Sequence, residues 1–414
     1  MSSRREAIFV ITRWLATQEF PDRMIPEGPD RAFITDLVYT TVRRRRTLEW
    51  ALERLLKKMP KGETEAALLV GAAQILFMPD VADYAAVNET VEAAKVASKQ
   101  TAGLVNGVLR NLLRQRDAVR ADLEKQPVGI RTSHPDALVT RWLERFGEEE
   151  TLALCTWNNT PAETFIAVPP GAPSPLPAAD APDAAPLPPN YFPLPRGLRV
   201  EEVPGYAEGA FIVQDPATAA AIDLLNVKPG LKVLDACAAP GGKTVQLAWR
   251  MGAPADAPQL LVALDLHEDR LATVRANLER TRQGWVTVCQ GDLAEGSLAA
   301  LEPFGLFDRI LIDAPCSNSG VLRRRADARW RWTTKRMKKL ADTQAQMLEH
   351  ALARLAPGGR LVYSTCSLEP EENRQQITAL RKAHPELACV GVEERIPTRS
   401  HTDGAFACAF ERQP

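Results

Sequence analysis

Apolar residues recur at three- and four-residue spacing through the first 116 residues of the chain. Ile8, Ile11 and Leu15 share one helical face at this spacing, and residues 33–42 repeat the pattern. Prolines between such stretches mark where helices have to end. The pattern predicts a compact all-α bundle, with further helices over 48–56, 66–78, 87–97 and 101–113.

The middle of the chain has a different composition. A Ser-His-Pro sequence at 133–135 precedes a helical segment that carries Trp142 and Phe146. Residues 169–195 are then dominated by proline and alanine, which bury too little apolar surface to fold alone. We expect an exposed loop or insertion there.

Short apolar runs alternate with helical segments from residue 211 onward. These runs lack a side-chain period, which is typical of strands buried on both faces of a parallel sheet. The predicted fold is multidomain, with an all-α bundle over 1–120, a connecting subdomain over 121–210 and a Rossmann-like α/β domain over 211–414. Its strands are expected near 232–235, 261–265, 286–292, 307–313 and 360–365.

The composition is that of a globular protein, since 45% of the 414 residues are hydrophobic, 25% are charged and the net charge is −1. No signal-peptide stretch follows Arg5 and no run of about 18 apolar residues occurs, so we expect a cytoplasmic protein away from membranes. We separately expect the protein to be a monomer. Seven cysteines without a Cys-x-x-Cys pair and five scattered histidines argue against disulfides and against a metal site.

Four predicted strands in succession end with an acid, at Asp235, Asp265, Asp292 and Asp313. Ligands of doubly wound sheets bind at this edge, and the small-residue loop before Lys243 lets the backbone approach one closely. Asp265 suits ribose hydroxyls and Asp292 suits an adenine amino group. The ligand is therefore expected to be an adenosine with a small polar tail. S-adenosylmethionine fits better than NAD, because no Gly-x-Gly-x-x-Gly cradle for a pyrophosphate is present.

Two cysteines follow the last two predicted strands, Cys316 in Asp-Ala-Pro-Cys-Ser and Cys366 in Ser-Thr-Cys-Ser. Because both cysteines are expected at the ligand edge of the sheet, a catalytic role is favoured over simple packing in the core. Cytosine C5 is a poor nucleophile, so its methylation requires a thiolate to add to C6 first. Lys243 and the helix termini are candidates for stabilising that thiolate. An amino-group methyltransferase would need an aromatic clamp in place of Cys316, so methylation of carbon is favoured.

Two basic stretches favour RNA as a partner. Residues 1–116 carry a net charge of +4 and include four successive arginines, which cover every direction around a helix. Residues 323–339 carry a net charge of +8 together with two tryptophans, and an aromatic ring can stack on an unpaired base while basic groups hold phosphates. The residues predicted to contact RNA are Arg43, Arg44, Arg45, Arg46, Arg323, Arg324, Arg329 and Trp330.

The front of the chain resembles the NusB-like RNA-binding domain over about 110 residues. The resemblance rests on Asn-Glu-Thr-Val from Asn88 and on Leu-Val-Asn-Gly-Val-Leu-Arg from Leu104. It implies a helical RNA-binding module in front of an RNA-modifying enzyme.

Three motifs resemble those of the Sun/Fmu (RsmB-type) ribosomal RNA cytosine-C5 methyltransferases of the NOL/NOP/Sun family. They are Asp-Ala-Cys-Ala-Ala-Pro-Gly-Gly-Lys-Thr from Asp235, Asp-Ala-Pro-Cys-Ser from Asp313 and Tyr-Ser-Thr-Cys-Ser-Leu-Glu-Pro-Glu-Glu-Asn from Tyr363. The resemblance implies a class I methyltransferase domain that uses S-adenosylmethionine to make 5-methylcytosine in small-subunit (16S) ribosomal RNA through a covalent cysteine–C6 adduct.

The same resemblance implies a role for individual residues. Cys366 is the nucleophile, Cys316 assists release of the product, Asp313 also reaches the cytosine edge, and Glu371 and Asn373 order the nucleophile loop. Cys237 is expected to pack within the cofactor loop. The implied cofactor site consists of Cys237, Ala238, Ala239, Pro240, Gly241, Gly242, Lys243, Asp265, Asp292 and Asp313.

The chain departs from the family pattern at 167–169, at 403–406, and at Asn318-Ser319-Gly320, where Gly-Thr-Gly is usual. These departures bear on which nucleotide is recognised. Two alternatives stay open, a non-catalytic RNA-binding factor of ribosome assembly or antitermination and a transfer RNA cytosine-C5 methyltransferase, because fold does not fix substrate.

Overall fold

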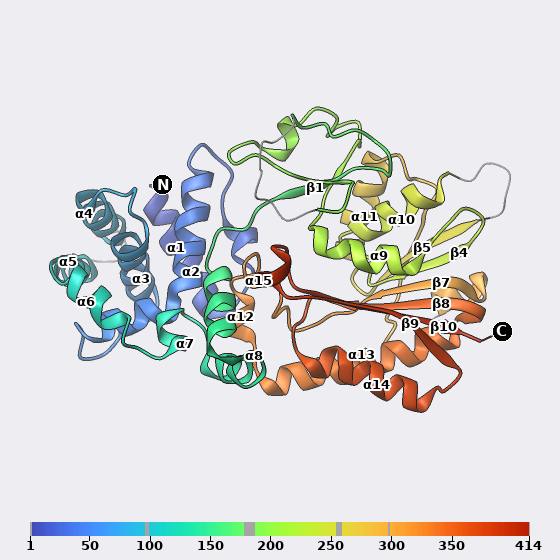
Figure 1. The fold of residues 1–414 in the computed structure, drawn as a ribbon. Coiled ribbons are helices and arrows are strands. Elements are labelled where there is room, and N and C mark those ends of the chain that lie inside the picture. Colours follow the sequence, from blue (N-terminus) through green and yellow to red (C-terminus); the bar gives the residue numbers. More distant parts are fainter. Residues whose placement is uncertain (1, 96–98, 178–186, 254–258, 297–298, 414) are drawn as a thin grey trace. The chain divides into compact units, whose positions relative to one another are not determined.

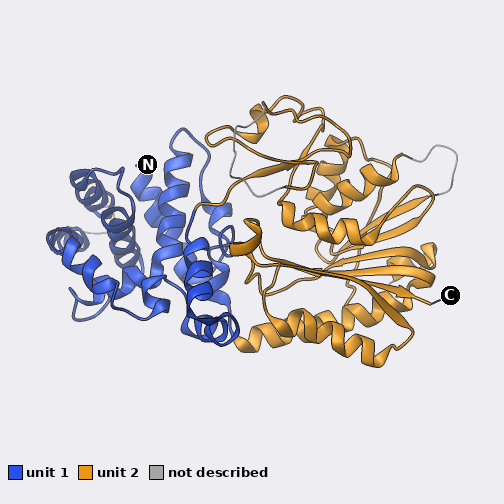
Figure 2. Cartoon of the chain, in the orientation of Figure 1, with its two compact units in different colours: residues 1–160, 322–333 blue, residues 161–321, 334–414 orange. Residues whose placement is uncertain are grey.

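The computed structural model describes residues 2–95, 99–177, 187–253, 259–296 and 299–413 (Figure 1). The chain forms two compact units, 1–160 with 322–333, and 161–321 with 334–414 (Figure 2). These units divide the chain elsewhere than at residues 120 and 210, and the three predicted domain ranges stay a prediction.

Every regular element among the described residues of the first unit is a helix, which confirms the all-α prediction. The expected helices near 33–42 and 48–56 are one continuous helix, because apolar positions on the same face are buried along its whole length. The core of this unit contains Ile8 and Ile11, and Trp142 is also almost completely buried. The helices are α1 (Ser3–Thr17), η1 (Pro21–Met24), α2 (Arg31–Glu53), α3 (Glu63–Phe77), α4 (Asp83–Ala94), α5 (Lys99–Arg114), α6 (Arg116–Leu123), α7 (Val128–Arg131), α8 (Asp136–Trp157) and α12 (Ala328–Arg331).

Arg329 on α12 lies inside this unit and has no exposed surface. Its Nη1 donates to the Ser133 carbonyl (3.2 Å) and to Asn159 Oδ1 (2.8 Å), and its Nη2 donates to the carbonyls of Asn158 (3.0 Å) and Leu322 (3.3 Å). Burial lowers the pKa of Arg329 to about 9. The predicted RNA contact of Arg329 is therefore replaced by a structural role, because the guanidinium satisfies carbonyl groups that would otherwise be buried without a donor.

Replacing Arg329 by Met should lower the free energy of unfolding by about 3 kcal/mol or more, since several buried carbonyls lose their donor at once. Urea unfolding followed by far-UV circular dichroism measures this loss. Arg325→Met, at an exposed position of the same segment, is the matched control and should change stability by less than about 1 kcal/mol. Equal stability of the two variants would contradict the structural role.

The second unit is built on a seven-stranded sheet in the order β6-β5-β4-β7-β8-β10-β9. The first five of these strands run parallel, and β10 lies antiparallel between β8 and β9. The predicted mostly parallel sheet is confirmed, and the two C-terminal strands are an addition to it. The strands are β4 (Lys232–Ala236), β5 (Leu260–Asp265), β6 (Thr287–Gln290), β7 (Phe307–Asp313), β8 (Leu355–Thr365), β9 (Leu387–Arg395) and β10 (Ala405–Arg412).

Helices cover both faces of this sheet (Figure 1). Alternate side chains of each strand enter opposite cores: Val233 packs with α9, α10 and α11, whereas Leu234 packs with α13 and α14. Burial on both faces explains why these strands lack a side-chain period. The helices of this unit are η2 (Val200–Glu202), η3 (Pro216–Thr218), α9 (Ala219–Leu225), α10 (Gly242–Met251), α11 (Glu268–Arg280), η4 (Ala299–Phe304), α13 (Thr334–Ala353), η5 (Pro370–Glu372), α14 (Arg374–Ala383) and α15 (Pro397–Ser400).

A second, three-stranded sheet is made by β1 (Phe165–Ala167), β2 (Tyr191–Pro193) and β3 (Ile212–Val213) in the order β2-β1-β3. The expectation of a loop over 169–195 is therefore wrong for β2, where buried Tyr191 anchors the strand by bonding to Gln246. Residues 178–186 of that expected loop lie outside the described residues. Among the described helices, none has the length and apolar character needed to span a membrane.

Candidate active site

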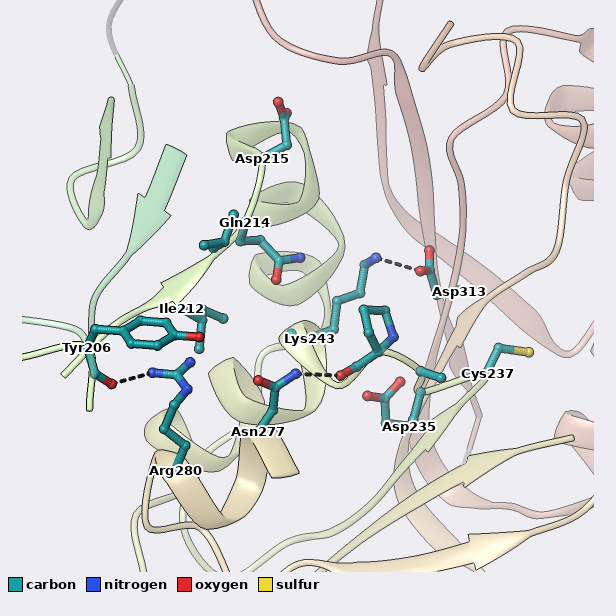
Figure 3. A pocket seen from close by; sticks show the side chains of 15 residues that line it. Tyr206, Ile212, Gln214, Asp215, Asp235, Cys237, Lys243, Asn277, Arg280 and Asp313 are labelled. Atoms are coloured by element: carbon teal, nitrogen blue, oxygen red, sulfur yellow. Dashed lines mark hydrogen bonds and ion pairs between the residues drawn. The ribbon is translucent and has the colours of Figure 1, made fainter. Parts of the chain in front are cut away.

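A cavity of about 410 Å³ opens at the carboxyl ends of β4 and β7 (Figure 3). This volume is within the range of small-molecule sites, roughly 300–1,000 Å³. Seven of the predicted cofactor residues line it, whereas Gly241, Asp265 and Asp292 do not. The lining residues are Tyr206, Ile212, Val213, Gln214, Asp215, Asp235, Cys237, Ala238, Ala239, Pro240, Gly242, Lys243, Asn277, Arg280 and Asp313.

The loop between β4 and α10 forms the floor of the cavity. Gly241 has a φ of 101°, a conformation that side chains rarely adopt. A Cβ at Gly242 would lie 2.0 Å from Gln214 Oε1, so only glycine fits there without a shift. The loop is tied to the sheet by the Ala238 N–H, which donates to the Leu264 carbonyl at 2.9 Å. Backbone thus lies directly against the cavity, as the sequence predicted.

Asp265 and Asp292 bond to neighbouring backbone. Asp265 accepts from the N–H groups of Ala239 (3.1 Å) and His267 (3.2 Å), which places its carboxylate behind the cofactor loop. Asp292 accepts from the Ala294 N–H at 2.8 Å, within the turn after β6. Their expected contacts with ribose and adenine stay predictions.

Asp235 presents a buried acceptor at the cavity. Thr244 donates its hydroxyl to Oδ2 at 2.6 Å, whereas Oδ1 is buried without a hydrogen-bond partner among the described residues. Burial raises the pKa of Asp235 to about 7, against the opposing effects of Thr244 and the Lys243 charge. A buried oxygen of this kind is satisfied when a ligand brings a donor to it.

Lys243 lines the cavity and pairs with Asp313, which lies three residues before Cys316. Its Nζ lies 2.6 Å from Asp313 Oδ2, and the Ser364 hydroxyl donates to Asp313 Oδ1 at 2.9 Å. Burial by itself lowers the pKa of Lys243, but Asp313, Asp235 and Cys366 outweigh it and raise that pKa. Lys243 therefore stays cationic within electrostatic reach of Cys366, and its expected stabilisation of the Cys366 thiolate stays a prediction.

The two predicted catalytic cysteines meet at the ends of β7 and β8. The Sγ atoms of Cys316 and Cys366 are 3.2 Å apart. Cys316 is only 8% exposed, and its contact with Cys366, followed by burial, raises the pKa of the Cys316 thiol well above its usual range. Cys316 accordingly remains a thiol, whereas the partly exposed Cys366 has a cation nearby.

Glu372 was overlooked by the sequence reasoning, which named its neighbour Glu371. The buried Glu372 carboxylate accepts from the Ser317 N–H (2.8 Å) and hydroxyl (2.5 Å), from the Ser367 hydroxyl (2.5 Å) and from Gln344 Nε2 (3.2 Å). Ser317 and Ser367 directly follow the two cysteines, so one carboxylate joins both loops. The position of Glu372 in the Pro-Glu-Glu-Asn segment, just after Cys366, was the one sequence feature that could have indicated its role.

Asn373 bonds to the loop that carries Cys366. Its Oδ1 accepts from the Thr365 hydroxyl at 2.6 Å and its Nδ2 donates to the Ser367 carbonyl at 2.7 Å. These residues flank Cys366 on both sides. Cys237, by contrast, packs in the cofactor loop, and burial raises the pKa of its thiol well above the usual range.

Seven further lining residues carried no motif that pointed to the cavity, namely Tyr206, Ile212, Val213, Gln214, Asp215, Asn277 and Arg280. Arg280 and Asn277 come from α11, where Arg280 Nη1 donates to the Tyr206 carbonyl (2.9 Å) and Asn277 Nδ2 to the Pro240 carbonyl (2.9 Å) (Figure 3). Gln214 and Asp215 come from the segment after β3. Helix α11 and β3 reach the site only through tertiary packing, so spacing along the chain gave no signal for them.

The four successive arginines on α2 are half-buried and have partners within their own unit. Arg43 donates to the Arg323 carbonyl (3.1 Å), Arg45 bonds to Glu49 (2.7 Å), and Arg46 pairs with Asp136 (2.5 Å).

Arg44 lies over the Phe77 ring, and burial, followed by the charge of Arg43, lowers its pKa to about 10. The predicted RNA contacts of the four half-buried arginines stay predictions, and their side chains also have partners within the unit.

The later basic stretch divides into buried and exposed parts. Arg323 is 7% exposed, with its guanidinium 4.2 Å from the Trp157 ring centroid. Arg324 is half-buried, and Trp330 donates its indole N–H to the Val42 carbonyl at 2.8 Å. The exposed basic residues of the stretch lie mainly at the start of α13, namely Lys335, Arg336, Lys338 and Lys339.

Comparisons with known proteins agree with this architecture. Residues 222–410 match the family model of the 16S rRNA methyltransferases RsmB/F, and residues 1–114 match the NusB family. The probable ribosomal RNA small subunit methyltransferase B of Synechocystis is 34% identical over 98% of this chain and 95% of its own length. The chain belongs to the RsmB/F methyltransferase family. The Vibrio cholerae ribosomal RNA small subunit methyltransferase B is 33% identical over 91% of this chain and 87% of its own length.

Solved structures show the same fold. The crystal structure of PH0851 superposes with a TM-score of 0.77 at 22% identity and covers 99% of this chain and 98% of its own. A methyltransferase homologue from Pyrococcus horikoshii reaches a TM-score of 0.56 at 25% identity over 69% of this chain and 97% of its own. The predicted NusB-like bundle and Rossmann-like methyltransferase domain are confirmed.

S-adenosylmethionine is the cofactor of this methyltransferase family, and the residues of the cavity fit it. Asp235 Oδ1, which has no hydrogen-bond partner in the described part of the chain, offers an acceptor to the hydroxyl or ammonium donors of the cofactor. Gly242 lets the start of α10 approach closely. Gln214 and Asn277 add polar groups to the wall of the cavity.

Binding of S-adenosylmethionine should strengthen as pH rises through about 7, because that is where the buried Asp235 ionises and becomes the better acceptor. Below this pH the raised pKa keeps Asp235 protonated. Isothermal titration calorimetry of wild type and Asp235→Asn over this range tests the expectation. The variant should bind about tenfold more weakly at neutral pH and lose the dependence; a wild-type affinity that is flat with pH would contradict it.

Proposed function

We propose that the chain transfers a methyl group from S-adenosylmethionine to C5 of a cytosine in small-subunit ribosomal RNA. The observation that supports this most directly is the 3.2 Å contact between Cys316 and Cys366 Sγ, next to the Lys243–Asp313 pair at the cavity. Carbon methylation of a pyrimidine needs a thiol that adds and then leaves, whereas a simple binding protein needs neither cysteine.

Cys366 acts as the nucleophile in this proposal. Its thiolate forms an S–C6 bond, and the C5=C6 electron pair becomes available for C5 to form a new bond. The bound cofactor supplies a methyl group carried on a positively charged sulfur. Once C5 carries the methyl group and has lost its proton to a base, the S–C6 bond breaks, the double bond re-forms and Cys366 leaves as a thiolate.

Cys316 assists that release. Its high pKa keeps a proton next to the departing Cys366 sulfur, where a hydrogen bond stabilises the developing thiolate. Lys243 contributes its positive charge from the other loop. Asp313 is held by Lys243 and Ser364 and is the candidate for contacting the cytosine edge.

Replacing Cys366 by Ala should reduce methyl transfer at least about a thousandfold, because no covalent adduct can form. Replacing Cys316 by Ala should instead accumulate a covalent protein–RNA adduct that survives denaturing gel electrophoresis. Labelled S-adenosylmethionine with 16S ribosomal RNA measures transfer, and bisulfite sequencing identifies the product cytosine.

Cys389→Ala, on strand β9, is the control and should keep wild-type activity. Full activity of Cys366→Ala would show that the nucleophile is assigned wrongly. RNA retained on a filter without label transfer would favour the non-catalytic ribosome-assembly or antitermination factor. Label transfer to transfer RNA in place of ribosomal RNA would favour the transfer RNA enzyme.

RNA contact is proposed for the exposed start of α13, where four basic side chains lie within five residues. The double variant Lys338→Glu with Lys339→Glu should bind RNA about tenfold more weakly. The salt dependence of its binding should also be smaller, because fewer counterions are released. Filter binding over a range of salt concentrations measures both effects. Arg381→Glu/Lys382→Glu on α14 makes the same charge change at another exposed site; equal losses in the two variants would mean that only net charge matters.

A further inference from the structure

The loop after Cys316 contacts the nucleophile loop at three successive residues. Asn318 Oδ1 lies 3.2 Å from Cys366 Sγ, the Ser319 hydroxyl accepts from the Leu368 N–H (2.9 Å), and the Gly320 N–H donates to the Cys366 carbonyl (3.0 Å). Only the first of these contacts touches the reactive sulfur. Asn318 itself has a φ of 61°, in the left-handed region that asparagine and glycine adopt more readily than other residues.

The orientation of the Asn318 amide is fixed by its second contact. Its Nδ2 donates to the Cys316 carbonyl at 3.1 Å, and a carbonyl oxygen can only accept. Turning the amide over would place two oxygen acceptors against each other. The amide oxygen must therefore face Cys366, and an oxygen in that position can bond to the S–H form of the side chain but not to the thiolate.

The contacts form a chain from one thiol to the next. Cys366 donates its proton to Asn318 Oδ1, which leaves the Cys366 sulfur to accept from the S–H of Cys316. The positive charge of Lys243, itself paired with Asp313, acts in the opposite direction and favours the Cys366 thiolate. The negative charge of the buried Glu372 raises the pKa of the Cys316 thiol and so helps to keep Cys316 protonated.

We propose that Asn318 is a positioning residue that holds Cys366 as a protonated, hydrogen-bonded thiol until RNA enters the site. The role depends on the proposed function only in naming Cys366 as the nucleophile. A cytosine that enters must displace the Asn318 contact, after which Lys243 faces a sulfur without an acceptor beside it. The enzyme would thus keep its thiol unreactive toward adventitious electrophiles when no RNA is bound.

The test is the pH dependence of Cys366 alkylation by iodoacetamide in the full chain without RNA, followed by mass spectrometry of the Cys366 peptide. Asn318→Gly suits the left-handed backbone and removes only the amide. Its alkylation at neutral pH should be about three- to tenfold faster than that of wild type, with the profile displaced to lower pH, because a hydrogen bond to the neutral form is lost.

Asn318→Asp is the second variant and should displace the profile to higher pH, because a carboxylate accepts from the thiol and repels the thiolate. Ser319→Ala is the matched control, since it removes a contact between the same two loops without touching the sulfur, and its profile should match wild type. Faster alkylation in all three variants would indicate a loosened loop and overturn the proposal, as would a wild-type profile for Asn318→Gly.

This measurement uses neither RNA nor methyl transfer. If Cys366→Ala retained methyl transfer, the nucleophile assignment would be overturned, whereas opposite displacements in Asn318→Gly and Asn318→Asp would still establish the contact that controls the thiol. A failure of the nucleophile assignment can therefore be distinguished from a failure of the proposed role of Asn318.

Discussion

The geometry of the active site depends on one buried carboxylate. Glu372 accepts from Ser317 and Ser367, the residues that follow the two cysteines, and so holds the loops after β7 and β8 together. The cost of burying this carboxylate appears as a raised pKa, and four donors offset it. This carboxylate adds to the contacts that Asn318, Ser319 and Gly320 make with the loop of Cys366, and together they keep the two sulfur atoms in contact.

Acids and thiols of similar intrinsic chemistry differ in this site because their electrostatic surroundings differ. Asp313 is paired with Lys243 and Ser364. Asp235 is buried, one of its oxygens has no partner among the residues that the structure describes, and burial raises its pKa to about 7. The cysteines differ in the same way, because Cys316 is buried and Cys366 is partly exposed near a cation. Environment, more than residue type, distinguishes the group proposed to bind the cofactor from the group proposed to react.

Charge along the sequence was a weaker guide than apolar periodicity. Arg329 stood in the most basic stretch of the chain, yet its side chain is fully buried and bonds to backbone carbonyls. Arginine suits this role because its planar fork carries five donors and its stem is apolar. The exposed charge of that stretch lies several residues later, at Lys335 to Lys339, where the helix face is open to solvent.

The sequence by itself determined the helical first unit, the parallel strands and the cofactor loop, because periodicity, small residues and strand-end acids are local signals. It also indicated that Cys316 and Cys366 share one edge, since parallel strands end on the same side. Only the tertiary structure decided that Glu372 rather than Glu371 joins the loops, and that Gln214 and Arg280 line the cavity. Those contacts depend on how β3, α11 and the two cysteine loops pack, and a one-dimensional pattern carries no distance between residues far apart in the chain.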